Sequence, residues 1–147
     1  MANLKSKPLQ LLCPKPGSQR KRRSEESSHQ KAFFQWLTLW DKNVRALTFH
    51  IPNGGSRHAF EARSLKAQGV TAGVPDIFCA IPTKDFSGLW IELKSTKGAL
   101  TEKQKIMGNL LRRSGYQCYV AYSWFEARDM LIHYLGCGIP DDRRLST

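Results

Sequence analysis

The chain has 147 residues, 41% of them hydrophobic, and a formal net charge of +11 at pH 7. This length and composition are those of a single globular domain with its own core, and no apolar run approaches the ~20 residues that a membrane-spanning helix needs. The positive charge favours a polyanionic partner, so we expect the protein to bind nucleic acid and no membrane.

The N-terminal residues 1–23 carry much of this charge, with seven Lys or Arg and no acidic residue. Prolines interrupt the segment and it has no periodic apolar pattern, so we expect a disordered basic arm. The arm is either a solvated tail or a contact to DNA, and it ends in four basic residues, Arg20, Lys21, Arg22 and Arg23. Its apolar run at residues 9–13 is too short for the core of a signal peptide. We therefore expect a cytoplasmic, nucleoid-associated protein that is not secreted.

The first helix is expected from Ser24 to about residue 40. Ser24 is suited to the N-cap position, and Glu25 and Glu26 follow in the first turn, where the helix dipole favours negative charge. Glu26 and Gln30 are one turn apart and therefore share a face. Apolar side chains at helical spacing predict the buried face; they are Phe33, Phe34, Trp36, Leu37 and Trp40.

Residues 44–51 have the composition of a strand, and the Pro-Asn-Gly-Gly sequence that follows ends it. Ser56 is suited to cap a further helix. Because a helix N-terminus beside glycines offers free N–H groups to a phosphate, we expect Asn53, Ser56 and Arg57 to bind nucleic acid. Two roles stay open for His50, which either lines the same site or simply ends the strand.

Two further apolar runs, residues 73–81 and 89–94, predict strands that are joined by a hairpin loop. Asp76, Glu92 and Lys94 lie inside these runs, where an unpaired charge is costly. If the strands pair antiparallel, the start of the first comes level with the end of the second, and the three charged side chains converge. Two explanations remain open. Either Lys94 neutralises the carboxylates in a structural ion pair, or the cluster holds a divalent cation and a water that attacks phosphorus.

The rest of the chain predicts a helix, a strand and a last helix. Thr101 and Ser123 are suited to cap the two helices, and residues 117–122 alternate between them like a strand. The polar residues 137–147 are expected to form a C-terminal tail. We therefore expect one α/β domain over residues 24–136, with a four-stranded mixed sheet flanked by helices.

A Pro-Asp pair followed, after a loop, by Glu-x-Lys resembles the signature of the PD-(D/E)XK nuclease superfamily. The surrounding sequence is similar to one branch of it, the VRR-NUC (virus-type replication-repair nuclease) domain, over about residues 24–136. Five pieces carry the resemblance in the expected order: Glu26 with Ser27 and Gln30, His50–Arg57, Gly69–Asp76, Ile91–Gly98 and Leu100–Gln104. The resemblance implies the PD-(D/E)XK nuclease core, with a helix between its first two strands, in a stand-alone protein of the viral or prophage type.

The resemblance also implies a metal site. Asp76 and Glu92 would bind Mg²⁺, which Mn²⁺ can replace, together with the backbone carbonyl of Leu93. These are the hard oxygen ligands that Mg²⁺ prefers. Glu26 would be the acidic residue of the first helix and would bind a second metal ion or position a water. Glu25 is the alternative if the register is off by one.

The resemblance implies catalytic roles for two further side chains. Lys94 would orient the attacking water and offset the charge that builds on the phosphorane, and Gln104 would hold Lys94 or a phosphate. Lys97 would contact nucleic acid. The chain has no Gly-rich nucleotide-binding loop, so we expect no nucleotide cofactor.

Together these expectations describe a metal-dependent, structure-specific DNA endonuclease that acts in DNA repair. A homodimer that resolves four-way (Holliday) junctions is the form that small stand-alone relatives suggest, with its interface on the aromatic first helix and on the last helix. The alternatives are a nuclease for flaps or other branched DNA, a DNA-binding protein that uses the fold without cutting, and a sequence-specific restriction enzyme.

Overall fold

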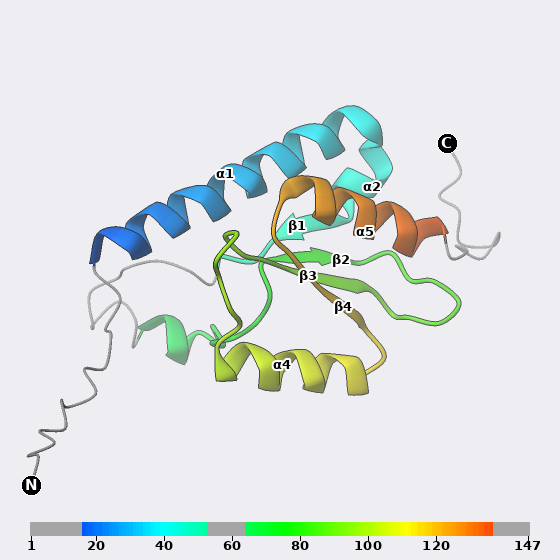
Figure 1. Ribbon diagram of the computed structural model, residues 1–147. Coiled ribbons are helices and arrows are strands. Elements are labelled where there is room, and N and C mark those ends of the chain that lie inside the picture. Colours follow the sequence, from blue (N-terminus) through cyan, green and yellow to red (C-terminus); the bar gives the residue numbers. More distant parts are fainter. Residues whose placement is uncertain (1–15, 53–63, 137–147) are drawn as a thin grey trace, which may run out of the picture.

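A computed structural model of the chain describes residues 16–52 and 64–136 (Figure 1). The helices and strands are α1 (Pro16–Trp40), α2 (Lys42–Ala46), β1 (Thr48–His50), β2 (Ile77–Cys79), β3 (Leu89–Leu93), α4 (Glu102–Arg113), β4 (Gln117–Ala121) and α5 (Trp124–Gly136). The first part of the predicted arm, most of the helix predicted after Ser56 and the predicted C-terminal tail lie outside the described residues. None of the helices in the described part is long and apolar enough to cross a membrane.

The four strands form one mixed sheet in the order β1-β2-β3-β4. β1 pairs with β2 and β2 with β3 antiparallel, whereas β3 and β4 are parallel. Parallel neighbours need a crossover connection, and α4 supplies it between β3 and β4. The predicted α/β class, the mixed four-stranded sheet and the antiparallel hairpin are therefore confirmed. The pairing of Ile77 with Ile91 brings the residue before β2 level with the end of β3.

The helices lie on both faces of this sheet. Figure 1 shows α1 and α5 side by side over one face and α4 over the other. Phe33 and Leu37 from α1 and Leu131 from α5 are fully buried against the strands. Tyr134 of α5 donates a hydrogen bond from its hydroxyl to the carbonyl oxygen of Ile81, at 2.6 Å, which fastens α5 to the segment after β2.

The aromatic face predicted for the first helix is only partly buried. Phe34 and Trp36 pack against the core from its edge. Trp40 is 44% exposed and stacks on Trp36, with ring centroids 5.0 Å apart, and the neighbouring Leu39 is 88% exposed. The end of α1 therefore leaves apolar surface uncovered by the described part of the chain.

α1 begins earlier than the sequence predicts. The helix starts at Pro16, so residues 16–23, predicted as part of a disordered arm, are its first turns. The physical reason lies in the residue types: proline is favourable at the first helical position, and Arg, Lys and Gln are good helix formers. The basic run is therefore part of a helix that is continuous with the domain.

The strand predicted over residues 44–51 is shorter than expected. Val44 belongs to α2, and β1 covers only Thr48–His50. Asp41 causes the difference, because its carboxylate accepts hydrogen bonds from the backbone N–H groups of Asn43 and Val44 and so caps a short helix there.

The predicted caps of the last two helices are confirmed. Thr101 and Gln104 form a capping box at the start of α4, in which each side chain binds the backbone of the other residue. At the start of α5, the Ser123 hydroxyl accepts a hydrogen bond from the N–H of Glu126.

Candidate active site

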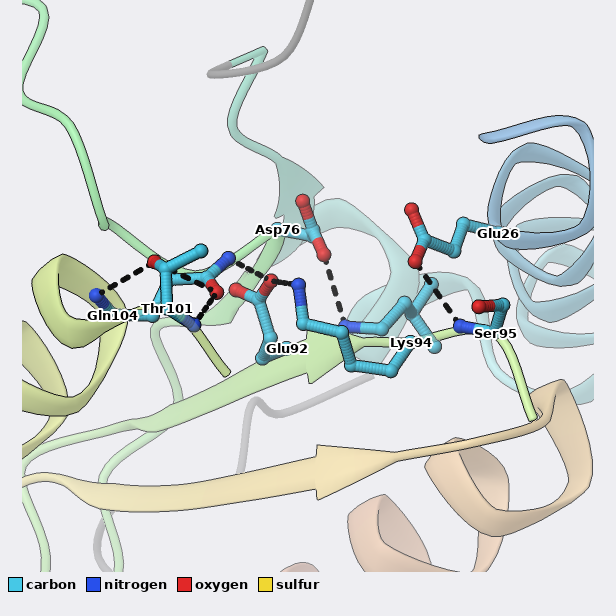
Figure 2. Close-up of polar contacts among 8 residues, drawn as sticks. Glu26, Asp76, Glu92, Lys94, Ser95, Thr101 and Gln104 are labelled. Atoms are coloured by element: carbon cyan, nitrogen blue, oxygen red, sulfur yellow. Dashed lines mark hydrogen bonds and ion pairs between the residues drawn. The ribbon is translucent and has the colours of Figure 1, made fainter. Parts of the chain in front are cut away.

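Asp76 lies at the end of the loop that leads into β2, and two backbone contacts fix its position. Its Oδ2 accepts a hydrogen bond from the N–H of Leu93, at 2.9 Å, across the hairpin (Figure 2). Its carbonyl oxygen accepts from the N–H of Ile51 and lies 2.8 Å from Nδ1 of His50. Because a carbonyl oxygen can only accept, Nδ1 carries the proton in this contact. His50 therefore belongs to the site, as a residue that holds the backbone of Asp76.

Glu92 and Lys94 lie two residues apart on β3 and its continuation, so their side chains share one face of the sheet. Lys94 Nζ is 2.8 Å from Glu92 Oε1, and both side chains are almost fully buried. The same carboxylate oxygen accepts a short hydrogen bond from Nε2 of Gln104. In the structure Gln104 therefore holds Glu92, and a contact of Gln104 with a bound phosphate, which the resemblance implies, stays a prediction.

The amide of Gln104 is oriented by the capping box of α4. Its Oε1 accepts from the N–H of Thr101 at 2.9 Å, which directs Nε2 towards Glu92. Figure 2 shows these contacts as one chain from α4 to the end of β3. Thr101 thus acts on the site through Gln104. The sequence identifies it as a cap but gives no sign of this connection.

The approach of α4 to the site depends on Gly73. Its φ is +92°, in the left-handed region that favours glycine, and a Cβ added there would lie 2.5 Å from the carbonyl oxygen of Lys103. Only a residue without a side chain lets the loop before Asp76 pass this close to the first turn of α4. Gly73 therefore helps to bring Gln104 within reach of Glu92.

α1 brings a third carboxylate to the site. Glu26 Oε1 accepts from the N–H of Ser95, at 3.1 Å, and Glu25 binds the N–H and the hydroxyl of the next residue, Thr96. Only Glu26 lines the cavity that contains Asp76. The structure therefore places Glu26 in the site and Glu25 beside the turn that follows β3.

These side chains surround one open cavity of about 370 Å³. Four of its lining residues come from residues 23–30 of α1, and the others come from the end of β1, the hairpin, its approach loop and α4. They are Arg23, Glu26, Ser27, Gln30, His50, Gly73, Val74, Asp76, Glu92, Leu93, Lys94 and Gln104. The predicted catalytic and metal-binding residues are all among them.

The pKa values of two carboxyls in the cavity are raised, first by burial and then by the charges of neighbouring carboxylates. Burial raises the pKa of Asp76, although the hydrogen bond from Leu93 and the charge of Lys94 oppose the shift. Burial, and after it repulsion by Asp76, raises the pKa of Glu92 from an ordinary 4.5 to about 7 despite the ion pair with Lys94. The charge of Glu26 contributes in the same direction to both shifts. A bound cation would relieve this repulsion.

The donor set fits a divalent cation of the Mg²⁺ type. Within residues 16–52 and 64–136, no three His, Cys, Asp or Glu side chains are already arranged as a metal site. Mg²⁺ does not require this, because it commonly takes one or two carboxylates and completes its shell with water and substrate phosphate. Asp76 and Glu92 direct such oxygens into one cavity, where burial raises the pKa of both carboxyls and a cation would stabilise their ionised forms.

The predicted nucleic-acid residues divide into three groups. Asn53, Ser56 and Arg57 lie outside the described residues. Lys97 is exposed in the turn after β3 and does not line the cavity. Of the basic run at residues 20–23, only the last member does so.

For three residues in or next to the site, the sequence did not predict the position or the contact that the structure shows. Arg23 was assigned to an arm, His50 was left undecided and Thr101 was assigned only a capping role. Helical spacing from Glu26 was the available signal for Arg23, because residues three apart share a face. The other two depend on contacts between distant segments, which no local pattern shows.

Two comparisons with known proteins bear on the chain. The family model described as "VRR-NUC domain" matches residues 15–124. A solved structure described as "VRR_NUC domain protein" superposes with a TM-score of 0.70 at 25% sequence identity, and the match covers 82% of this chain and 97% of that one. No curated protein matches the sequence.

Proposed function

The chain belongs to the VRR-NUC family, and on this basis we propose that it is a metal-dependent endonuclease that hydrolyses phosphodiester bonds in branched DNA. The family implies a nuclease that acts on DNA. One observation supports the catalytic part of the proposal: Asp76, Glu92 and Lys94 converge in one cavity. Glu26 of α1 lines the same cavity. Carboxylates beside a buried ammonium are the groups that metal-assisted phosphodiester hydrolysis requires.

Asp76 and Glu92 are the residues that would hold a divalent metal, which the family typically uses, with Glu26 and the carbonyl of Leu93 as further oxygen donors. A divalent cation bound there would supply Lewis acidity and lower the pKa of a bound water. The protein holds both carboxylates in advance: Leu93 N–H orients Asp76, and Gln104 orients Glu92. Such fixed groups need little rearrangement when the substrate binds.

Lys94 has the position of the group that assists the attacking water. Its ammonium is 2.8 Å from Glu92 and faces the cavity. There it donates hydrogen bonds to the water and to a phosphate oxygen, and its charge offsets the charge that builds on phosphorus. In the reaction the attacking water gives up a proton to solvent as its oxygen forms a new bond to phosphorus. The bond from phosphorus to the leaving sugar oxygen breaks, and that oxygen takes up a proton from solvent.

The rival function is DNA binding without cleavage. The net charge of +11 fits both functions equally well. The carboxylates that line the cavity favour the nuclease, because a protein that only binds gains nothing from placing Asp76, Glu92 and Glu26 where they repel phosphate. A third function, that of a sequence-specific restriction enzyme, has no feature of the described residues in its favour.

Two variants test the catalytic assignment. Asp76→Asn and Lys94→Ala are expected to abolish Mg²⁺- or Mn²⁺-dependent cleavage of labelled single strands, duplexes, flaps and four-way junctions. Glu102→Gln, which alters an exposed carboxylate on α4, is the control and is expected to cut normally. Thermal melts of all three confirm that they are folded. If either site variant still cleaves DNA, the catalytic assignment of that residue is wrong. If the native protein shifts DNA in gels but never nicks it, DNA binding without cleavage is the better explanation.

The specificity that we propose is for four-way junctions cut by a homodimer. A junction has two-fold symmetry, and a two-fold dimer presents two matching active sites. Exposed apolar side chains lie on the two helices that pack side by side, and they would form the interface: Leu39 and Trp40 on α1, Phe125 and Ile132 on α5.

The oligomeric state tests this specificity. Sedimentation is expected to show a dimer at micromolar concentration, and Leu39→Glu is expected to dissociate it and to prevent paired cuts in a junction. A monomer at that concentration, or cleavage of flaps with junctions left intact, contradicts the proposal of a junction-resolving dimer.

A further inference from the structure

The basic run at residues 20–23 is distributed over different faces of α1. Arg23 lines the active-site cavity with Glu26, Ser27 and Gln30, which follow it at spacings of three, four and seven residues. These spacings define one face of a helix. Arg20 and Lys21 line a separate shallow depression, together with Ser24, Glu25 and Ser28. The four basic residues are therefore not equivalent.

The rotation of α1 about its axis is fixed close to Arg23. Glu26 and Glu25 bind consecutive backbone N–H groups of the turn after β3. Further along the helix, Phe33 and Leu37 are fully buried in the core. Because these contacts leave the helix one orientation, Arg23 is held facing the cavity, and Figure 1 shows the helix running unbroken through this region.

The guanidinium of Arg23 is available to a ligand. Arg23 is exposed, and the ion pairs formed within the described residues do not include it. It lies three residues, about 4.5 Å along the helix axis, from Glu26, towards the N-terminus of α1. The planar guanidinium fork matches two oxygens of a phosphate, which the point charge of a lysine does not.

We propose that Arg23 is a substrate-contacting residue of the active site that binds, through two hydrogen bonds, a phosphate adjacent to the scissile one on the cleaved strand. This inference rests on the proposed nuclease function, because it is the chemistry at Asp76, Glu92 and Lys94 that defines the scissile phosphate. Arg23 thereby sets which linkage of a bound strand lies over the carboxylates.

Cleavage kinetics with DNA below saturation give the first test. Arg23→Ala is expected to lower kcat/KM by about tenfold to a hundredfold, as expected for the loss of hydrogen bonds to a charged group, and Arg23→Lys should recover part of this loss. Lys31→Ala, an exposed charge on the same helix outside the cavity, is the matched control and should change kcat/KM by less than about threefold, as for other surface changes. Equal effects of Arg23→Ala and Arg22→Ala would show that only general attraction is lost, and would overturn the inference.

Uncharged methylphosphonate linkages in the DNA show which phosphate Arg23 contacts. Methylphosphonates are placed one at a time along the cleaved strand, and at one position beside the cut the native protein is expected to lose about tenfold or more in rate. In Arg23→Ala the same methylphosphonate should cost nothing further, because interacting changes are not additive. A loss that persists undiminished at every position in Arg23→Ala contradicts the contact.

Binding separates the inference from the proposed function. Anisotropy of labelled DNA in EDTA at low salt should show a loss of affinity for Arg23→Ala at least about fivefold greater than for Arg22→Ala, in line with a charge-assisted contact. If the native protein cleaves no DNA but the two variants differ in affinity as expected, the proposed nuclease function is wrong and the contact between Arg23 and a phosphate is supported. If Arg23→Ala and Arg22→Ala bind DNA equally well, the proposed contact of Arg23 is wrong, whatever the cleavage assay shows.

Discussion

Replacing Glu92 by glutamine is predicted to stabilise the metal-free protein while it abolishes cleavage. The carboxylate is 5% exposed, and burial and repulsion by Asp76 raise its pKa to about 7. At pH 8 it is ionised in an environment that favours its neutral form. Glutamine has the same shape, carries no charge, and its carbonyl oxygen can still accept from Lys94 and Gln104.

The magnitude follows from the difference between a pKa of about 7 in the folded protein and 4.5 in the unfolded chain. Because one pKa unit corresponds to 1.36 kcal/mol, ionised Glu92 costs the fold about 3 kcal/mol. The folded-state pKa is raised, so the stability that protonated Glu92 contributes is complete below pH 4.5 and is lost as the pH rises through 7. The Glu92→Gln variant does not lose this stability at high pH, because glutamine does not ionise.

Urea and thermal unfolding in EDTA at pH 5 and pH 8 measure the effect. At pH 8 Glu92→Gln should be more stable by about 3 kcal/mol, which raises the Tm by about 10 °C for a domain of this size. At pH 5 the gain should be much smaller. Glu102→Gln, the exposed control, should change stability by no more than about 1 kcal/mol at either pH. A variant that is less stable than the native protein at pH 8, or equally stabilised at both pH values, would refute the assignment of an uncompensated charge to this site.

Three further outcomes are expected. Thr101→Ala should destabilise the protein by about 1 kcal/mol in urea unfolding, as for other lost caps, and should lower kcat by releasing Gln104, whereas Thr101→Ser should restore both. Gly73→Ala should cost about 1–3 kcal/mol more than Gly69→Ala, because both glycines have a φ of +92° but only Gly73 meets the backbone of α4; equal losses would contradict the close approach. Mg²⁺ at about 100 times its Kd should stabilise the native protein by about 2.7 kcal/mol in thermal melts, and Asp76→Asn should lose this gain.

The parts of the fold that local patterns specify were predictable from the sequence. The two strands of the hairpin are apolar runs interrupted by charges and joined by a short polar loop. Alternation placed Glu92 and Lys94 on one face, and antiparallel pairing across the loop, once assumed, brought Asp76 level with them. The cap of α4 at Thr101 was likewise predicted, and the structure adds that Gln104 completes a capping box with it. In both cases the neighbours that decide the structure are close in sequence, or are joined to it by a short loop.

The errors occurred where two local tendencies compete. Residues 16–23 combine a proline, a glycine and a run of charges typical of disorder with good helix formers, and the start of α1 at Pro16 shows that the helical tendency prevails. Val44 has a high strand propensity, but it lies in α2 because Asp41 caps the N-terminus of that helix. The contact of His50 with the carbonyl of Asp76 could not be predicted at all, because it exists only once β1 and β2 have paired.

The contacts within the site explain how the fold keeps repelling carboxylates together. Asp76, Glu92 and Glu26 come from three segments, and each accepts a hydrogen bond from a group of another segment: Leu93 N–H, the Gln104 amide and Ser95 N–H. Two of these donors are backbone groups of one strand and its extension, so the positions of the carboxylates depend on the sheet rather than on flexible side chains. The pKa values of Asp76 and Glu92 are raised, chiefly by burial and for Glu92 also by repulsion from Asp76, so these bonds do not offset the whole cost of the two charges. The fold therefore maintains, through core packing elsewhere, a site whose negative charge a bound cation would offset.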